Sequence, residues 1–280
     1  MSIYQHNFLV REIAYNGHLQ SLGATAIAYI TSALLHLQVS LSLLVAPYLL
    51  FQAVYFFDRY YDASRDEKTN PVRTGHIKKY YRAIPYLIAL FLLTGLVLTL
   101  YTGTATATAF YVFAAVMGAL YPIVFKPLTT RIPLFKNFYV GLVFSAMVIF
   151  PFLFTDTTLT GSLVPYLLLL FIFLETFISQ IALDMKDEKA DRAIKLMTLP
   201  ALLGGDRAQN IVLVMSFTVA IAVTATALLL SAPYQVALLA VATLAFNVMM
   251  TRLVKNGKDI AFIAVAGKYL LWPALVLILP

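Results

Sequence analysis

Long uninterrupted runs of apolar residues are the feature that most constrains the fold of this chain. A helix needs about 20 apolar residues to cross the hydrocarbon core of a bilayer. Nine such runs occur, at residues 18–38, 40–61, 83–101, 105–124, 137–154, 162–183, 209–230, 233–251 and 260–279. Several, such as residues 212–230, are continuously uncharged and mostly apolar, whereas the strands of a membrane barrel alternate over about 10 residues. We therefore predict an all-α integral membrane protein with nine transmembrane helices.

The rest of the chain leaves little room for another domain. Hydrophobic residues make up 61% of its 280 residues and charged residues only 12%, which excludes an ordinary water-soluble domain. The longest polar stretches are residues 62–82 and 184–208, so we expect one membrane domain over residues 1–280. Residues 1–16 are polar, and the first span is expected to act as the insertion signal. The absence of cysteine excludes disulfides and thiolate metal sites.

Basic residues gather in alternate loops. Nineteen of the twenty Lys and Arg residues fall on one side of the predicted membrane, and Lys268 lies within a span. This bias predicts a multi-pass protein of the cell membrane with a cytosolic N-terminus, cytosolic basic loops and an outer C-terminus. It also accounts for the net charge of +7 without a nucleic acid as partner.

Two groups of aspartates lie at the predicted inner ends of the second and sixth spans. Their members are Asp58, Asp62 and Asp66 in the first group and Asp184, Asp187 and Asp191 in the second. Spacings of three or four residues keep each group on one face of a helix. Like charges on one face repel each other unless cations intervene, and hard carboxylate oxygens suit Mg²⁺, which also binds substrate phosphates. The pattern predicts a magnesium and diphosphate site.

Basic side chains near these aspartates suit the binding of phosphate. Arg73 follows the first group, Lys126 lies in the next inner loop and Lys186 lies within the second group. Arg forms forked hydrogen bonds with phosphate, and Lys acts as a point charge. The alternative is that these residues only contribute to the charge bias of the inner loops.

The motifs resemble those of the UbiA superfamily of intramembrane prenyltransferases. The stretch from Asp58 to Asp66, followed by Asn70-Pro71-Val72-Arg73, is similar to the family's first motif, Asn-Asp-x-x-Asp-x-x-x-Asp, and its following Arg. The second motif resembles Asp184 to Asp191 and the later Thr198-Leu199-Pro200. The Tyr and Lys after the family's fourth helix resemble Tyr121 and Lys126, and Lys136-Asn137 resembles the start of its fifth. Arg59 replaces the first Asp of the family, and Gln180 replaces a Glu.

The resemblance implies a nine-helix fold around a central cavity, in which an isoprenoid group passes from an allylic prenyl diphosphate to a lipophilic or aromatic acceptor with the help of Mg²⁺. The six aspartates would bind the metal. The implied catalytic residues are Asp62, Asp187, Lys126 and Tyr121. The implied diphosphate-binding residues are Arg59, Asn70, Arg73, Lys126, Gln180 and Lys186. Candidates for shielding an allylic cation are Tyr55, Tyr60, Tyr61 and Tyr121, although aromatic residues are also common at membrane interfaces.

Other functions remain open from the sequence. An enzyme of the same fold that cyclises or hydrates an isoprenoid, or extends a carotenoid, would need the same metal site. A secondary transporter is a further alternative, since charged residues within membranes also mark ion paths. Glu175 and Lys268 lie deep in two predicted spans, and we expect them to form a structural ion pair. The acceptor, the length of the prenyl chain and the oligomeric state do not follow from the sequence.

Overall fold

The computed structural model of the chain describes residues 8–69, 71–159, 161–255 and 265–278, and this part is built of helices and turns without a strand. The helices are α1 (Phe8–Tyr15), α2 (His18–Leu34), α3 (Leu41–Tyr61), α4 (Ala63–Thr69), α5 (Pro71–Lys78), η2 (Tyr81–Ala83), α6 (Ile84–Thr102), α7 (Ala105–Leu120), η3 (Tyr121–Phe125), α8 (Lys126–Leu128), α9 (Phe135–Ala146), α10 (Phe150–Phe154), α11 (Val164–Ala193), α12 (Leu199–Leu203), α13 (Gly205–Leu229), α14 (Tyr234–Lys255) and α16 (Lys268–Ile278).

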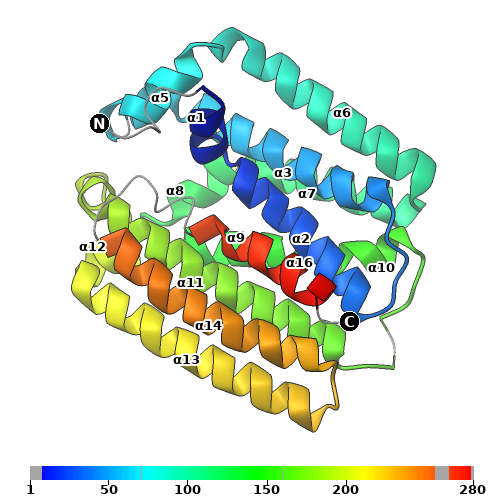
Figure 1. Cartoon of the computed structure of the whole chain (residues 1–280). Coiled ribbons are helices and arrows are strands. Elements are labelled where there is room, and N and C mark those ends of the chain that lie inside the picture. Colours follow the sequence, from blue (N-terminus) through cyan, green and yellow to red (C-terminus); the bar gives the residue numbers. More distant parts are fainter. Residues whose placement is uncertain (1–7, 70, 160, 256–264, 279–280) are drawn as a thin grey trace.

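The long helices lie alongside one another in two groups (Figure 1). In the first group, α3 packs against α2, α6 and α7, and in the second, α11 packs against α13 and α14. Helix α9 packs against α11, and α16 lies against α2 and α14, so these two elements join the groups. The short helices α1, α5, α8 and α12 gather at one end of the bundle.

The prediction of an all-α membrane protein is confirmed, but the number of nine spans is not. Within the described residues, seven helical segments are long and apolar enough to cross a bilayer: Leu41–Tyr61, Tyr81–Thr102, Ala105–Leu128, Phe135–Phe154, Val164–Ala193, Gly205–Leu229 and Tyr234–Val254. The first predicted span corresponds to α2, which has 17 residues. The last corresponds in part to α16, with 11 residues, and residues 260–264 of that span lie outside the described residues.

The outer helices present apolar side chains to their surroundings. On α6, Leu93 is 61% exposed, and on α13, Ile221 is 67% exposed. Soluble monomers rarely expose many large apolar side chains along one surface, whereas lipid tails are as apolar as Leu. The exposed faces of α6 and α13 therefore contact the hydrocarbon of the bilayer.

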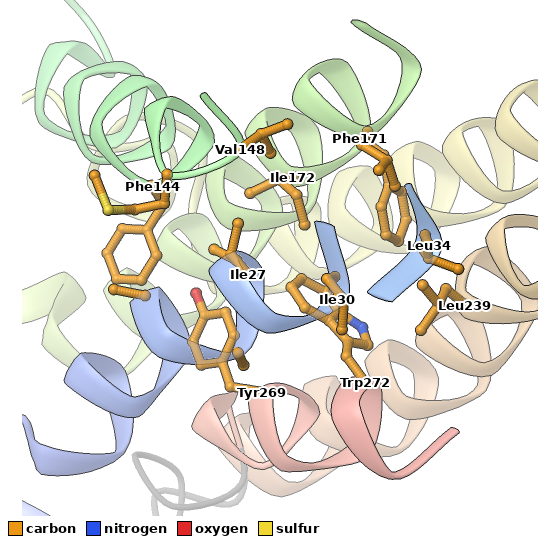
Figure 2. Packing of buried hydrophobic residues seen from close by; sticks show 14 of the residues in the cluster. Ile27, Ile30, Leu34, Phe144, Val148, Phe171, Ile172, Leu239, Tyr269 and Trp272 are labelled. Atoms are coloured by element: carbon orange, nitrogen blue, oxygen red, sulfur yellow. The ribbon is translucent and has the colours of Figure 1, made fainter. Parts of the chain in front are cut away.

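The centre of the bundle is filled by apolar side chains from helices that are distant in sequence. Figure 2 shows Ile27 and Ile30 of α2 between residues of α9, α11 and α16. Phe171 lies close to Trp272, with ring centroids 5.7 Å apart. The indole N–H of Trp272 donates to Thr243 Oγ1 over 2.8 Å, so its polar atom is satisfied within the core. Helix α2 is thereby held in the middle of the protein.

The expected ion pair between Glu175 and Lys268 is present within this core. Lys268 Nζ lies 3.7 Å from Glu175 Oε2 and donates to the backbone oxygen of Glu175 over 2.7 Å and to Ser179 Oγ. Asn247 Nδ2 donates to Glu175 Oε2 over 2.8 Å. Both charged side chains are almost fully buried, and these bonds compensate for their removal from water. The pair links α11, α14 and α16.

A second polar cluster fastens α1 to the end of the bundle. Glu12 Oε2 lies 2.8 Å from His76 Nε2 and 2.7 Å from the Tyr80 hydroxyl, and Glu12 Oε1 lies 3.3 Å from His18 Nε2. Burial raises the pKa of Glu12, but hydrogen bonds with His18, Tyr80, Asn16 and His76 outweigh it and lower the pKa to about 2. The cluster ties α1 to α2 and α5.

Candidate active site

A cavity of about 960 Å³ is lined by α3, α7, α9 and α11 and reaches the short helices α4, α5 and α8. All six aspartates of the two motifs line its polar end. Its deep end is lined by the apolar residues Leu50, Phe51, Ala114, Val140, Val143 and Phe144. The cavity is therefore polar at the end of the bundle and apolar in the membrane.

The first aspartate group keeps its helical spacing across the junction of α3 and α4. The backbone N–H of Asp62 donates to the oxygen of Asp58 over 3.0 Å, and that of Asp66 donates to the oxygen of Asp62 over 2.8 Å. The three side chains consequently share one face. Asp58 and Asp62 are 7% and 3% exposed.

Lys126, the first residue of α8, bridges two of these carboxylates. Its Nζ lies 3.1 Å from Asp58 Oδ1 and also contacts Asp62 Oδ2. A π-helical turn, Tyr121–Phe125, precedes it, and the N–H of Lys126 donates to the oxygen of Tyr121. Pro122 lies in this turn, and proline disrupts regular helical hydrogen bonding because it lacks an N–H. The wider turn brings Tyr121 and Lys126 to the cavity wall.

The second aspartate group lies on α11 and is bridged by a lysine from α9. Lys136 Nζ lies 2.9 Å from Asp184 Oδ1 and 3.3 Å from Asp191 Oδ2. Asn137 Nδ2 donates to Asp184 Oδ2 over 2.7 Å. Asp187 lies between Asp184 and Asp191 in the sequence, and its side chain is more exposed than either of theirs. Each aspartate group thus has a lysine that joins two of its members.

Two arginines complete the polar end. Arg59 Nη1 lies 3.3 Å from Asp58 Oδ2 and 3.9 Å from Asp66 Oδ2. Arg73 Nη2 donates to Asp66 Oδ2 over 2.6 Å. Both arginines line the cavity, so Arg59 lies in its wall.

The tyrosines divide into two sets. Tyr55 and Tyr121 line the cavity, together with Tyr139, whose ring lies 5.4 Å from that of Tyr121. Tyr60 instead stacks on Tyr81 of η2, with ring centroids 4.5 Å apart. Tyr61 is 47% exposed. Neither residue is among those that line the cavity, so both are poorly placed to shield a cation there.

The other predicted residues have different positions. Gln180 lines the cavity one turn deeper than Asp184. Lys186 lies 3.9 Å from Asp187 and is not among the residues that line the cavity, so its predicted contact with diphosphate has no support here. Asn70 lies outside the described residues. Sequence reasoning did not assign Lys136 or Tyr139 to the site.

The aspartate carboxylate oxygens at the polar end of the cavity are ligands that suit a divalent cation. Mg²⁺ binds carboxylate oxygens, usually one or two together with water and substrate phosphate. Within the described part of the chain, no three acidic or histidine side chains are grouped closely enough to hold a metal by themselves. Four of the six aspartates are instead joined in pairs by the ammonium groups of Lys126 and Lys136. A divalent cation at these carboxylates would take its remaining ligands from phosphate and water.

Comparison with known proteins identifies related sequences and folds. The model of the UbiA prenyltransferase family matches residues 21–278. No curated protein sequence matches the chain significantly. An apo structure of a UbiA homologue from Aeropyrum pernix K1 is similar, with 17% identity, a TM-score of 0.72 and coverage of 92% of this chain and 97% of that one.

Two structures of a UbiA homologue from Archaeoglobus fulgidus also match. The one bound to GPP and Mg²⁺ has 13% identity, a TM-score of 0.68 and coverage of 96% of this chain and 98% of that one. The one bound to DMAPP and Mg²⁺ has 14% identity, a TM-score of 0.64 and coverage of 96% and 100%. At these identities the likeness concerns the fold.

Proposed function

The chain belongs to the UbiA prenyltransferase family, and we propose that it transfers an isoprenoid group from an allylic prenyl diphosphate to a lipophilic or aromatic acceptor within the membrane. The observation that carries this proposal is the shape and charge of the cavity. Two aspartate groups and four basic side chains line one end, and apolar residues line the other. A diphosphate with an apolar tail has the matching distribution of polarity.

The basic residues have distinct roles in this proposal. Arg59 and Arg73 bind oxygens of the diphosphate by forked hydrogen bonds, and Lys126 contributes a point charge beside them. Asp58, Asp62 and Asp66 on one side and Asp184, Asp187 and Asp191 on the other hold Mg²⁺. When bound, Mg²⁺ neutralises the diphosphate and makes it a better leaving group.

In the reaction, the bond between the allylic carbon and the diphosphate oxygen breaks, and its electron pair leaves with the diphosphate. A new bond forms between that carbon and a nucleophilic atom of the acceptor, which loses a proton. Tyr55 and Tyr121 lie in the cavity wall, where their rings stabilise positive charge on the allylic group. The apolar end of the cavity excludes water from the same group.

The orientation of the protein is part of the proposal. The distribution of Lys and Arg supports a cytosolic location for the polar end of the cavity and for the N-terminus, with the C-terminus outside. The diphosphate then enters from the cytosolic face of the membrane.

The proposed activity is tested with purified protein, radiolabelled prenyl diphosphates and a membrane lipid extract as the source of acceptor. Replacement of Asp62 or Asp187 by Asn is expected to lower the rate at least about 100-fold, the scale for loss of a main electrostatic stabiliser. The matched control is Asp156→Asn, because Asp156 is exposed and lies outside the cavity. Full turnover in excess chelator contradicts the proposal. Mass spectrometry of the product separates prenyl transfer from cyclisation, hydration or carotenoid extension.

A further inference from the structure

A second, smaller cavity opens at the surface where α4 lies beside the junction of α5 and α6. It has a volume of about 580 Å³, and among the described residues only Ser64 lines both this cavity and the central one. We call it the junction cavity. Its lining residues are Ala63, Ser64 and Glu67 of α4, and Lys78, Lys79, Tyr80, Tyr81 and Arg82 of the junction.

The junction cavity carries more positive than negative charge. Lys78 Nζ lies 2.6 Å from Glu67 Oε1, so these two charges compensate each other. Within the described part of the chain, neither Lys79 nor Arg82 has a hydrogen bond or an ion pair through its side chain. Two positive charges therefore remain available in one concave site. Arg and Lys together are well suited to bind a phosphate group.

Two tyrosines hold the backbone that carries these charges. The hydroxyl of Tyr80 donates to Glu12 Oε2 over 2.7 Å, and that of Tyr81 donates to the backbone oxygen of Tyr60 over 3.2 Å. The ring of Tyr81 also stacks on the ring of Tyr60. The junction is thereby tied to α1 and α3 before any ligand binds, which lowers the entropic cost of binding an anion there.

The junction cavity lies at the level where the chain enters the membrane. The apolar segment Tyr81–Thr102 begins in its wall. Arg82 stands four residues before Tyr86, the first member of an exposed stripe along one face of α6. From Arg82 to Leu93 the helix rises about 16 Å, close to the roughly 15 Å of one leaflet of the hydrocarbon core. The stripe consists of Tyr86, Leu90, Leu93 and Val97.

We infer that the junction cavity binds the headgroup of an anionic phospholipid, whose phosphate pairs with Lys79 and Arg82 and whose acyl chains lie along the stripe on α6. A soluble phosphate would use the two charges but leave the stripe without a role. In the proposed orientation the site faces the cytosolic leaflet, where basic pockets attract anionic headgroups. Lipid binding at this site does not require the proposed transferase activity.

Binding is measured with the full chain in detergent and a phosphatidylglycerol that carries a fluorophore on one acyl chain, from the rise in fluorescence anisotropy. Unlabelled phosphatidylglycerol, phosphatidylcholine and glycerol 3-phosphate then compete for the site. We expect phosphatidylglycerol to compete at least about tenfold more strongly than phosphatidylcholine, whose headgroup has no net charge. Glycerol 3-phosphate should compete at least about tenfold more weakly than phosphatidylglycerol, because it lacks acyl chains to bury.

Variants of the two basic residues locate the site. Lys79→Gln and Arg82→Gln are each expected to weaken the binding of phosphatidylglycerol about fivefold, and the double variant about 25-fold. The matched control is Arg207→Gln with Arg252→Gln, which removes the same charge from exposed residues that line neither cavity. Lys126→Gln, which removes a charge from the central cavity, should leave the affinity for phosphatidylglycerol unchanged.

Four results overturn the inference. One is equal competition by phosphatidylglycerol and phosphatidylcholine in the unaltered chain, and another is an unchanged affinity in the folded double variant. Displacement of the labelled lipid by glycerol 3-phosphate at the same concentration as phosphatidylglycerol identifies a soluble phosphate as the ligand. A loss in Lys126→Gln as large as that in Lys79→Gln places the lipid in the central cavity instead.

Discussion

Replacement of Arg59 by Ala offers a test of the polar end that leaves the protein folded. In the unaltered chain Asp58 also has Lys126 at 3.1 Å, and Asp66 has Arg73 at 2.6 Å, so both carboxylates are expected to retain a cation in the variant. The substitution is therefore expected to weaken the binding of the prenyl diphosphate and to leave the stability of the fold nearly unchanged. One hydrogen bond to a charged group contributes about 1.5 to 3 kcal/mol, which corresponds to a rise in the Michaelis constant for the prenyl diphosphate of about 10- to 150-fold.

The assay for Arg59→Ala compares initial rates over a range of prenyl diphosphate and Mg²⁺ concentrations. The magnesium requirement is expected to stay, because the six aspartates are unchanged. Arg192→Ala is the control, since Arg192 is 60% exposed and pairs with Glu188 one turn earlier on α11. An unchanged Michaelis constant in Arg59→Ala refutes a contact with the diphosphate. Complete inactivity with binding that no longer depends on magnesium shows that Arg59 supports the metal ligands instead.

Three further predictions concern stability and orientation. Lys268→Met leaves Glu175 buried without its cation and is expected to lower the free energy of unfolding by about 3 kcal/mol, a drop of roughly 6 to 12 °C in the melting temperature. The double variant Lys268→Met, Glu175→Gln should regain most of this stability. Equal melting temperatures for the unaltered protein and both variants contradict the reasoning. Glu12 has a pKa of about 2 against 4.5 in the unfolded chain, so its contribution is full above pH 4.5 and is lost as the pH falls toward 2. Between pH 6 and pH 3 the unaltered protein should lose about 1 kcal/mol more stability than Glu12→Gln, after allowance for partial exposure, and identical losses refute the role of the cluster. A cysteine at Ser64 should react with a membrane-impermeant label only from the cytosol and one at Ser231 only from outside; a reversal of either contradicts the proposed orientation.

The fold followed from the sequence where hydropathy alone determines it. The positions at which the helices begin and end did not follow from hydropathy. Helix α11 continues to Ala193, ten residues past the predicted end of its span, because a helix persists through polar residues outside the hydrocarbon. The fifth predicted span is divided into α9 and α10 between Ala146 and Phe150, and Pro151, which has no N–H, lies in the first turn of α10.

The site was predictable in part, because the spacing of aspartates on one helix fixes the face that they share. Contacts between helices were not predictable in this way. Lys136 approaches Asp184 only because α9 packs against α11, and the sequence of either helix does not contain that information. The motif resemblance at Lys136-Asn137 was the one signal that pointed there. Tyr60 and Tyr61 were candidates because they lie near the motif, with a membrane-interface position as the alternative, and nearness in sequence does not show which side chains reach the cavity.

The ion pair between Glu175 and Lys268 also constrains the order of events during synthesis. The two residues are 93 positions apart, and at about 5 to 20 residues per second a ribosome needs roughly 5 to 20 s to add Lys268 after Glu175. During that interval α11 must enter the bilayer with a carboxyl group whose ammonium partner does not yet exist. A translocon accepts such a helix at a cost of about 3 kcal/mol, which the Leu, Ile and Phe residues of α11 offset. The ion pair forms only after α16, the last described helix to be synthesised, places Lys268 next to Glu175 of α11.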